Sequence, residues 1–303
     1  MKINVFSILE LYSFNFHKVI EILIFRNSED SQNKDKDRIK LESVFVYSEG
    51  IGLEMASSSY ILPKILHIFG ILNYVLFLGY KETIKDELTA LYPERKRFGG
   101  SWKYLTHWNI YLQLVYFCLA LVNDLFGSET RPNEACSRIQ KCRDFLFSTL
   151  AFPIGIFVPI IFWVLFNIDR KLVFPSELDQ IFPPITNHMM HTTSFPAQIL
   201  ELVFLYHEYP SRKYGIMTMV GFCLTYIGWI FYIAYASGIW VYGVLEVLTQ
   251  YQRLVFVMIL SLFGIVLYSI GELCNNKVWD CSMTKLGKNS KKLKQIKAQI
   301  KEN

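Results

Sequence analysis

Apolar residues gather in several runs of about twenty along this chain, separated by shorter polar stretches. A helix of that length crosses a hydrocarbon layer of about 30 Å. We expect six crossings, near residues 60–80, 104–126, 145–166, 185–206, 214–237 and 254–274. The fourth is the least apolar. The pattern therefore predicts an all-α, polytopic membrane protein built as a six-transmembrane-helix bundle.

The two ends of the chain differ from this apolar region. Residues 1–54 are only mildly apolar at first and then polar and charged, which predicts a poorly ordered N-terminal extension or the product of an upstream start codon. Residues 55–280 form the predicted transmembrane domain. Residues 281–303 form a lysine-rich tail. We therefore expect three regions, of which only the central one carries the fold.

Composition and charge support the membrane assignment. The chain is 52% hydrophobic and 16% aromatic, with a net charge of +5 over 303 residues. The tail lysines suit a cytoplasmic position beside anionic lipid, and an even number of crossings then places both termini in the cytoplasm. The basic loop at 81–103 opposes this orientation. No folded basic domain accompanies the tail, which excludes a nucleic-acid partner.

Two polar side chains at the starts of apolar runs carry the candidate chemistry. His191 lies in residues 187–193 (NHMMHTT) of the fourth run, and Thr106 opens the second. An ionisable group in a membrane helix usually faces the bundle interior and has a function. The second and fourth helices run in the same direction, and both residues lie within roughly the first 10 Å of their helices. We therefore expect Thr106 and His191 to meet near one membrane face, within reach of water.

A threonine beside a neutral histidine can perform nucleophilic catalysis. The imidazole removes the hydroxyl proton, the alkoxide attacks an ester, and the same ring activates water to hydrolyse the acyl-threonine. His191 is the better base because it lies deeper than His188, which could be a partner, an orienting group or a solvated end residue. Lys103 and Asn109 are candidate supports, for a substrate carboxylate and an oxyanion respectively.

The structural alternatives to these roles are substantial. Most membrane threonines bond to their own helix, and a membrane histidine can join helices. His188 and His191 could also ligate a metal, although the six histidines do not form the clusters that di-iron oxygenases need. For Lys64 and His67 we expect interfacial, snorkelling positions. Glu201 lies about 15 Å deeper than His191, too far for a direct catalytic role.

Several short motifs follow one another along the chain: 98–106 (FGGSWKYLT), 150–153 (LAFP), 187–193 (NHMMHTT), 209–212 (YPSR), 240–242 (WVY) and 271–273 (GEL) with Asn275, Asn276 and Trp279. In this order they resemble the motifs of the family of the androgen-induced protein and the androgen-dependent TFPI-regulating protein. The resemblance covers about residues 58–280. The first 54 residues have no counterpart, and Gly243 replaces an expected proline.

The resemblance implies a threonine hydrolase of fatty acid esters of hydroxy fatty acids, with Thr106 as nucleophile and His191 as catalytic histidine. We therefore expect a multi-pass protein of endomembranes, such as the endoplasmic reticulum, or of the plasma membrane. Its partners would be a lipid substrate and the bilayer, and its chemistry needs no metal or organic cofactor. The alternative is a non-catalytic carrier or regulatory protein with a polar intramembrane relay, although a carrier usually shows an internal repeat, which this chain lacks.

Overall fold

The computed structural model describes the backbone of residues 40–91, 98–130 and 135–302, and the side chains of residues 61–91, 98–130 and 135–279. By its contacts the chain divides after Tyr60 into two units. The described part of the first unit is the beginning of a single helix, α2 (Lys40–Thr83). The second unit, Ile61–Asn303, contains the other elements. The predicted extension (1–54) and basic tail (281–303) lie outside the residues with described side chains.

Helices make up the second unit, and its described residues contain no strand, which confirms the all-α prediction. After α2 come α3 (Lys85–Leu91), α4 (Leu105–Phe126), α5 (Arg138–Leu146), α6 (Phe152–Ile168), α7 (Pro184–His191), α8 (Ser194–Phe204), α9 (Arg212–Ser237), α10 (Gly243–Val247) and α11 (Gln250–Glu302).

Five stretches of helix within the described residues are long and apolar enough to cross a membrane. They are Ile61–Thr83, Leu105–Phe126, Arg138–Ile168, Arg212–Ser237 and Gln250–Trp279. The prediction of a polytopic membrane protein is confirmed. The predicted count of six is not, because the fourth expected crossing is divided between α7 and α8. The backbone leaves the helical region at Thr192, with φ −124°, and α8 has only 11 residues.

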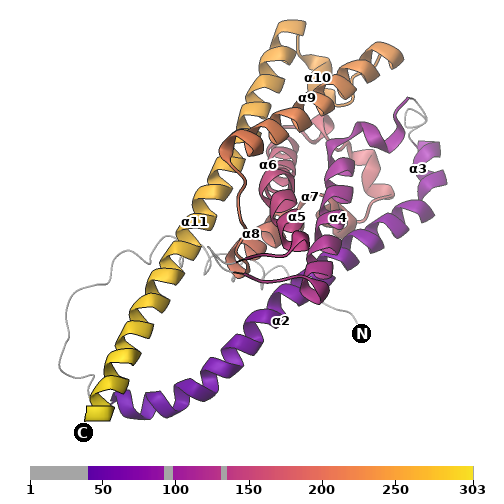
Figure 1. The fold of residues 1–303 in the computed structure, drawn as a ribbon. Helices are drawn as coiled ribbons and strands as arrows, with labels where there is room; N and C mark the ends of the chain where they lie inside the picture. Colours follow the sequence, from indigo (N-terminus) through magenta and orange to yellow (C-terminus); the bar gives the residue numbers. More distant parts are fainter. Residues whose placement is uncertain (1–39, 92–97, 131–134, 303) are drawn as a thin grey trace. The chain divides into compact units, whose positions relative to one another are not determined.

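The helix α6 lies at the centre of the bundle. It packs against α4, α8 and α11 (Figure 1). In an 18-residue apolar segment of the membrane-length stretch that contains α6, 61% of the residues are buried, against 22% in the corresponding segment of α9 and 28% in that of α11. The outer helices therefore present much of their apolar surface to lipid, while α6 supplies core contacts on several sides.

A single π-helical turn, η3 (Phe147–Ala151), joins α5 to α6. It precedes Pro153, the second residue of α6, which has no N–H to donate to the preceding turn. The side chain of Gln113 on α4 donates to the carbonyl of Ala151, the last residue of this π turn, at 2.8 Å. The local distortion of α6 is thus tied directly to α4.

Candidate functional site

The start of α4 is shaped by two glycines. Gly99 and Gly100 have φ values of +88° and +50°, a left-handed conformation that glycine adopts without steric cost. They lead the chain through a short 3₁₀ turn, η2 (Gly100–Lys103), to Tyr104, which precedes the first residue of α4. Thr106 therefore lies in the first turn of α4, beside the turn that the glycines create.

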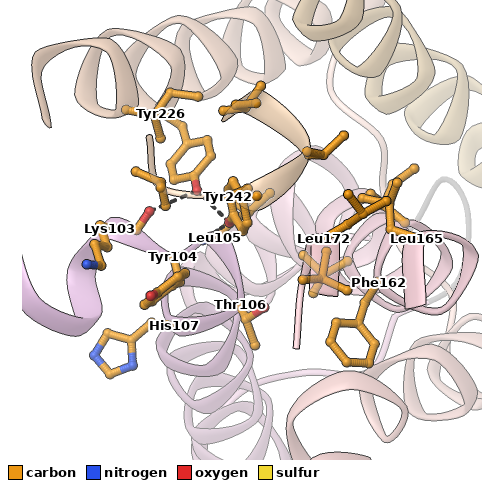
Figure 2. Close-up of a pocket in the computed structure, with 18 of the residues that line it drawn as sticks. Lys103, Tyr104, Leu105, Thr106, His107, Phe162, Leu165, Leu172, Tyr226 and Tyr242 are labelled. Atoms are coloured by element: carbon orange, nitrogen blue, oxygen red, sulfur yellow. Dashed lines mark hydrogen bonds between the residues drawn. The ribbon is translucent and has the colours of Figure 1, made fainter. Parts of the chain in front are cut away.

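Two tyrosines from distant elements hold this turn in place (Figure 2). The amide of Leu105 donates to the hydroxyl of Tyr242 at 2.8 Å, and the hydroxyls of Tyr242 and Tyr226 lie 2.7 Å apart. Tyr226 then donates to the carbonyl of Lys103 at 3.0 Å. Burial raises the pKa of Tyr242 to about 12, so its hydroxyl stays protonated and continues the chain of hydrogen bonds.

Thr106 and His191 come together as the sequence predicts. Thr106 Oγ1 lies 3.2 Å from His191 Nε2, a distance at which a hydroxyl can donate to an imidazole. The His191 side chain is 5% exposed. Its ring stacks on Phe162 of α6, with centroids 3.5 Å apart and planes 3° from parallel. The imidazole is therefore held face-on against the central helix, with its edge toward the threonine.

The other nitrogen of the ring bonds to Asn187, one turn earlier on α7. His191 Nδ1 lies 2.8 Å from Asn187 Oδ1. An amide oxygen only accepts, so in this arrangement Nδ1 carries the proton and Nε2 accepts from Thr106. Asn187 was part of the motif 187–193, but sequence reasoning assigned it no role. Its i, i+4 spacing from His191 was the available signal.

A largely apolar cavity of about 410 Å³ opens beside the pair. Thr106 and His191 both line it. Its other walls come from η2, α6, α9, α10 and α11 and include Phe157, Phe162, Met219, Phe222, Tyr226 and Leu260. Apolar cavities of a few hundred Å³ with a few converging polar groups are typical of small-molecule sites. This one suits a hydrocarbon chain.

The three predicted support residues occupy different positions. Lys103 lines the cavity, with its Nζ 5.4 Å from the centre of the Tyr104 ring. His188 points elsewhere: its Nδ1 lies 2.9 Å from Thr192 Oγ1. Asn109 is fully buried and does not line the cavity. Of the three, only Lys103 is placed where it could meet a molecule in the cavity.

A second polar cluster lies farther along α4 and α8. His67 Nδ1 lies 2.7 Å from Asp124 Oδ2, and its Nε2 lies 3.0 Å from Glu201 Oε2. The His67 side chain is completely buried. The expectation of an interfacial, snorkelling His67 is therefore wrong, because two carboxylates from other helices enclose the ring. This pairing joins residues far apart in the sequence, so the local pattern carried no signal for it.

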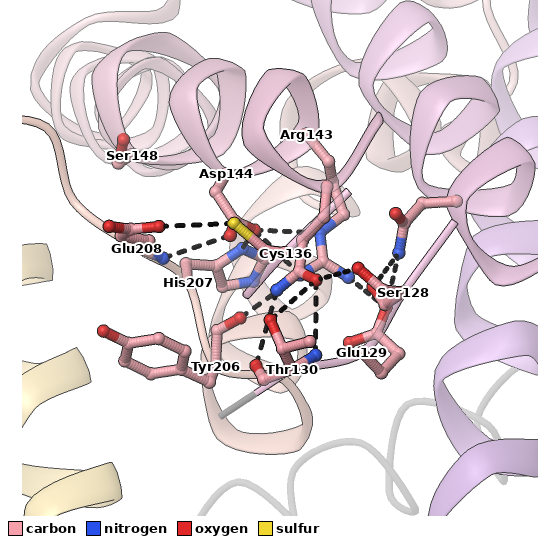
Figure 3. Close-up of polar contacts among 12 residues, drawn as sticks. Ser128, Glu129, Thr130, Cys136, Arg143, Asp144, Ser148, Tyr206, His207 and Glu208 are labelled. Carbon is pink, nitrogen blue, oxygen red and sulfur yellow. Dashed lines mark hydrogen bonds and ion pairs between the residues drawn. The ribbon is translucent and has the colours of Figure 1, made fainter. Parts of the chain in front are cut away.

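The same cluster continues between α5 and the segment after α8 (Figure 3). Buried Arg143 bonds to Asp144 through both Nε and Nη2 and pairs with Glu129, and His207 Nδ1 lies 3.0 Å from Asp144 Oδ1. Burial raises the pKa of Glu129 to about 6, despite the nearby Arg143. Asn275 of α11 bonds to the backbone of His207 in both directions. These contacts join α5, the segment after α8, and α11.

No group of three or more His, Cys, Asp or Glu side chains in the described part of the chain is arranged to hold a metal ion. His188 and His191, considered above as ligands, bond to Thr192 and Asn187 instead.

The residues that the structure describes form a helical bundle with five membrane-length helices, which defines an integral, multi-pass membrane protein. The family described as FAR-17a/AIG1-like protein matches residues 64–276, and the chain belongs to it. The human androgen-induced gene 1 protein is 32% identical over 69% of this chain and 91% of its own length. The rat androgen-dependent TFPI-regulating protein is 37% identical over 72% and 94%. No solved structure matches this chain.

Proposed function

We propose that this protein is a membrane-embedded ester hydrolase with Thr106 as nucleophile and His191 as general base. The main support for this proposal is the 3.2 Å contact between Thr106 Oγ1 and His191 Nε2 at the wall of an apolar cavity. A hydroxyl, a base that can take its proton and an orienting group on the far side of that base are the parts that nucleophilic catalysis requires.

In the first half-reaction Thr106 Oγ1 attacks the carbonyl carbon of the ester, and its proton passes to His191 Nε2. The tetrahedral intermediate collapses as the ester C–O bond breaks. The departing alkoxide takes the proton from His191 and leaves as an alcohol. The acyl group remains on Thr106 as a new ester.

In the second half-reaction water attacks the acyl-threonine. His191 Nε2 accepts a proton from this water and returns it to Thr106 Oγ1 as the acyl–threonine bond breaks. The products are a carboxylic acid and the regenerated hydroxyl. Asn187 keeps the Nδ1 proton in place through both halves, so the same ring nitrogen serves each time.

The negative oxygen of both intermediates needs a hydrogen-bond donor. The start of α4 is suited to this task, because the first-turn amides of a helix have no partner within it and the helix dipole favours an anion there. The amide of Leu105 already bonds to Tyr242. We therefore assign the oxyanion contact to the amide of Thr106 rather than to the side chain of Asn109.

The substrate class proposed is fatty acid esters of hydroxy fatty acids, giving a fatty acid and a hydroxy fatty acid. The apolar lining suits an acyl chain, and the ammonium of Lys103 at the same cavity suits the free carboxylate. Such a lipid would enter from the bilayer. We propose an endomembrane location, with the endoplasmic reticulum as the leading compartment.

The test uses purified protein with a panel of fatty acid esters of hydroxy fatty acids and with an organophosphonate probe. We expect wild type to hydrolyse the esters and to be labelled by the probe. Thr106→Ala should abolish both, and His191→Ala should lower turnover by at least about a hundredfold, the usual contribution of a general base. Thr106→Ser retains a hydroxyl and should keep measurable activity.

The matched control is Thr225→Val on α9. Its hydroxyl bonds to the carbonyl of Gly221 in its own helix, and it does not line the cavity. Its turnover should equal that of wild type. Labelling of Thr106→Ala at the wild-type level would contradict the nucleophile assignment. A wild-type protein that hydrolyses none of the esters would favour the alternative, a carrier or regulatory protein.

A further inference from the structure

Below the catalytic pair, the facing polar residues of α4 and of α7–α8 match one for one. On α4 they are spaced 3, 4 and 3 residues apart, and on α7–α8 the spacing is the same. Each bonded pair is therefore 85 residues apart in the sequence. The pairs are Thr106–His191, Asn109–Ser194, Gln113–Gln198 and Tyr116–Glu201. We call the last three pairs the polar rungs.

The polar rungs are buried, and the two side chains of each rung bond to each other. The side chains in all three are at most 1% exposed. Asn109 Nδ2 lies 3.5 Å from Ser194 Oγ, Gln198 Nε2 lies 2.6 Å from Gln113 Oε1, and the hydroxyl of Tyr116 bonds to Glu201. None of the six residues lines the cavity beside Thr106, which argues against a solvated transport path and for a register lock.

The spacing gives the rungs a specific mechanical effect. The two helices run in the same direction, so each rung lies about one turn beyond the previous one. A slip of one residue would rotate every polar side chain by about 100° away from its partner. Because the rung side chains are buried in the seam, the interface of α4 with α7–α8, the separated groups would find no substitute partners. Fixing helix register is the best-attested role of a polar group buried in an apolar interface.

The rung residues also contact helices other than α4, α7 and α8. Gln113 Nε2 also bonds to the carbonyl of Ala151 in η3, at 2.8 Å. Gly155 of α6 covers the Gln113–Gln198 rung so closely that a β-carbon there would lie 2.7 Å from Gln113 Nε2. At the far end Glu201 bonds to buried His67 of α2 at 3.0 Å. The register of α4 and α8 is thus set against two further helices.

The position of His191 depends on this register, because His191 is not part of α8. It ends α7, and the chain breaks from helical geometry at Thr192 before α8 begins at Ser194. Of the three polar rungs, Asn109–Ser194 is the one next to this break in the sequence. A shift of α4 against α8 at this rung would also change how far His191 Nε2 lies from Thr106.

We propose that Asn109, Gln113, Ser194 and Gln198 are positioning residues, which hold α4 and α7–α8 in the register that brings Thr106 Oγ1 to His191 Nε2. The proposal rests on the proposed function for its kinetic consequence. The geometric consequence is independent of it. Misplacing reacting groups by about 1 Å can cost about a hundredfold in rate, so disrupting a rung should lower kcat more than it raises KM.

The experiment compares Gln198→Leu and Ser194→Ala with the isostere Gln198→Glu in the full chain. Burial disfavours the charged form of the carboxyl group that Gln198→Glu introduces. The group therefore stays protonated, and its hydroxyl can still donate to Gln113 Oε1. We expect kcat to fall by roughly 10- to 100-fold in Gln198→Leu and by less in Ser194→Ala, with KM changed by under about threefold. Gln198→Glu should keep kcat near the wild-type value. The matched polar-to-apolar control is the α9 double variant Thr218→Val/Thr225→Val, which should also keep the wild-type kcat.

A second readout does not depend on hydrolysis. In protein with ¹⁵N-labelled histidine, the Nε2 signal of His191 reports its bond to Thr106, and Thr106→Val supplies the signal of the unbonded ring. Gln198→Leu and Ser194→Ala should move the signal toward that position, and Gln198→Glu should not. Thermal unfolding of each variant accompanies the spectra. Ser194→Ala is the small truncation that carries the test if Gln198→Leu does not fold.

The outcomes separate the two proposals. A shifted His191 signal in protein that hydrolyses no ester would support the positioning role and contradict the hydrolase. An unshifted signal in both rung variants would overturn the positioning role, whether kcat stays at the wild-type value or falls together with the unfolding temperature.

Discussion

At the scale of single residues, the state of His191 depends on a neighbour in its own helix. Asn187 Oδ1 accepts from Nδ1 at 2.8 Å, and Phe162 stacks on the ring. The asparagine selects the tautomer and the phenylalanine limits rotation. Together they aim an unprotonated Nε2 at Thr106, and the orienting group among the described residues is a neutral amide. The motif 187–193 therefore supplies both the base and the group that orients it.

This arrangement predicts the effect of replacing Asn187. Asn187→Leu removes the acceptor for the Nδ1 proton, so the ring can adopt the other tautomer, in which Nε2 cannot accept from Thr106. We expect ester turnover to fall by about 10- to 1000-fold, less than the roughly 10⁴-fold loss when a triad loses its orienting aspartate, because the asparagine carries no charge. Steady-state kinetics of the purified variant check this.

Asn187→Asp is the informative companion variant. Its carboxylate retains an acceptor at the same distance, so it should keep far more activity than Asn187→Leu. Equal activity of the leucine variant and wild type would show that the tautomer is set by another group.

At the scale of elements, the site depends on close approach between α6 and the seam of α4 with α8. Gly155 allows this approach: an added β-carbon would lie 2.7 Å from Gln113 Nε2 and 2.8 Å from Gln198 Cγ. The π turn η3 faces the same seam, since its Ala151 carbonyl accepts from Gln113. This bond therefore ties the irregular entry into α6 to the rung residues of α4.

Gly155→Ala should therefore destabilise the protein, although alanine is the better helix former. We expect a loss of about 1–3 kcal/mol, typical of overpacking a tight core, measured as lower thermal stability in detergent. The control is Gly221→Ala on α9, where a β-carbon would meet nothing within 4 Å. That variant should be neutral or stabilised by up to about 1 kcal/mol. An equal response of the two variants would contradict the close packing at Gly155.

At the scale of the whole second unit, hydrogen bonds connect neighbouring helices at both ends of α4. Thr106 and His191 meet at one end of the α4–α8 seam. At the other end, His67, Asp124 and Glu201 join the beginning of the apolar part of α2 to the end of α4 and to α8. Over this distance α7 and α8 accompany α4 in the same direction. This favours their acting together as a broken crossing, although neither is long enough alone.

The count of crossings remains a prediction, and epitope tags can test it. With six crossings, tags at the N and C termini should become accessible together under selective permeabilisation of the plasma membrane, on the cytoplasmic side. A tag after Gly238, between α9 and α10, should stay protected under the same conditions. With five crossings, the terminal tags would lie on opposite sides.

The length of the apolar runs was sufficient to locate most of the membrane-length helices. The expected second run, 104–126, corresponds to α4 (Leu105–Phe126), and the expected fifth, 214–237, lies within α9 (Arg212–Ser237). Length and apolarity fix such elements locally, because a membrane helix must satisfy its backbone bonds internally. The break at Thr192 had a weaker signal, because polar residues there suited both a crossing and a helix end.

The sequence by itself determined the membrane class, the family motifs and the two residues, Thr106 and His191, whose chemistry and helical depth suit each other. Only the tertiary structure decided which side chains surround them. Tyr226 and Tyr242 hold the start of α4, and two carboxylates enclose His67, through contacts between residues far apart in the chain. Periodicity reports which face of a helix is apolar, but the partner of a buried polar group depends on how the helices pack and in what register.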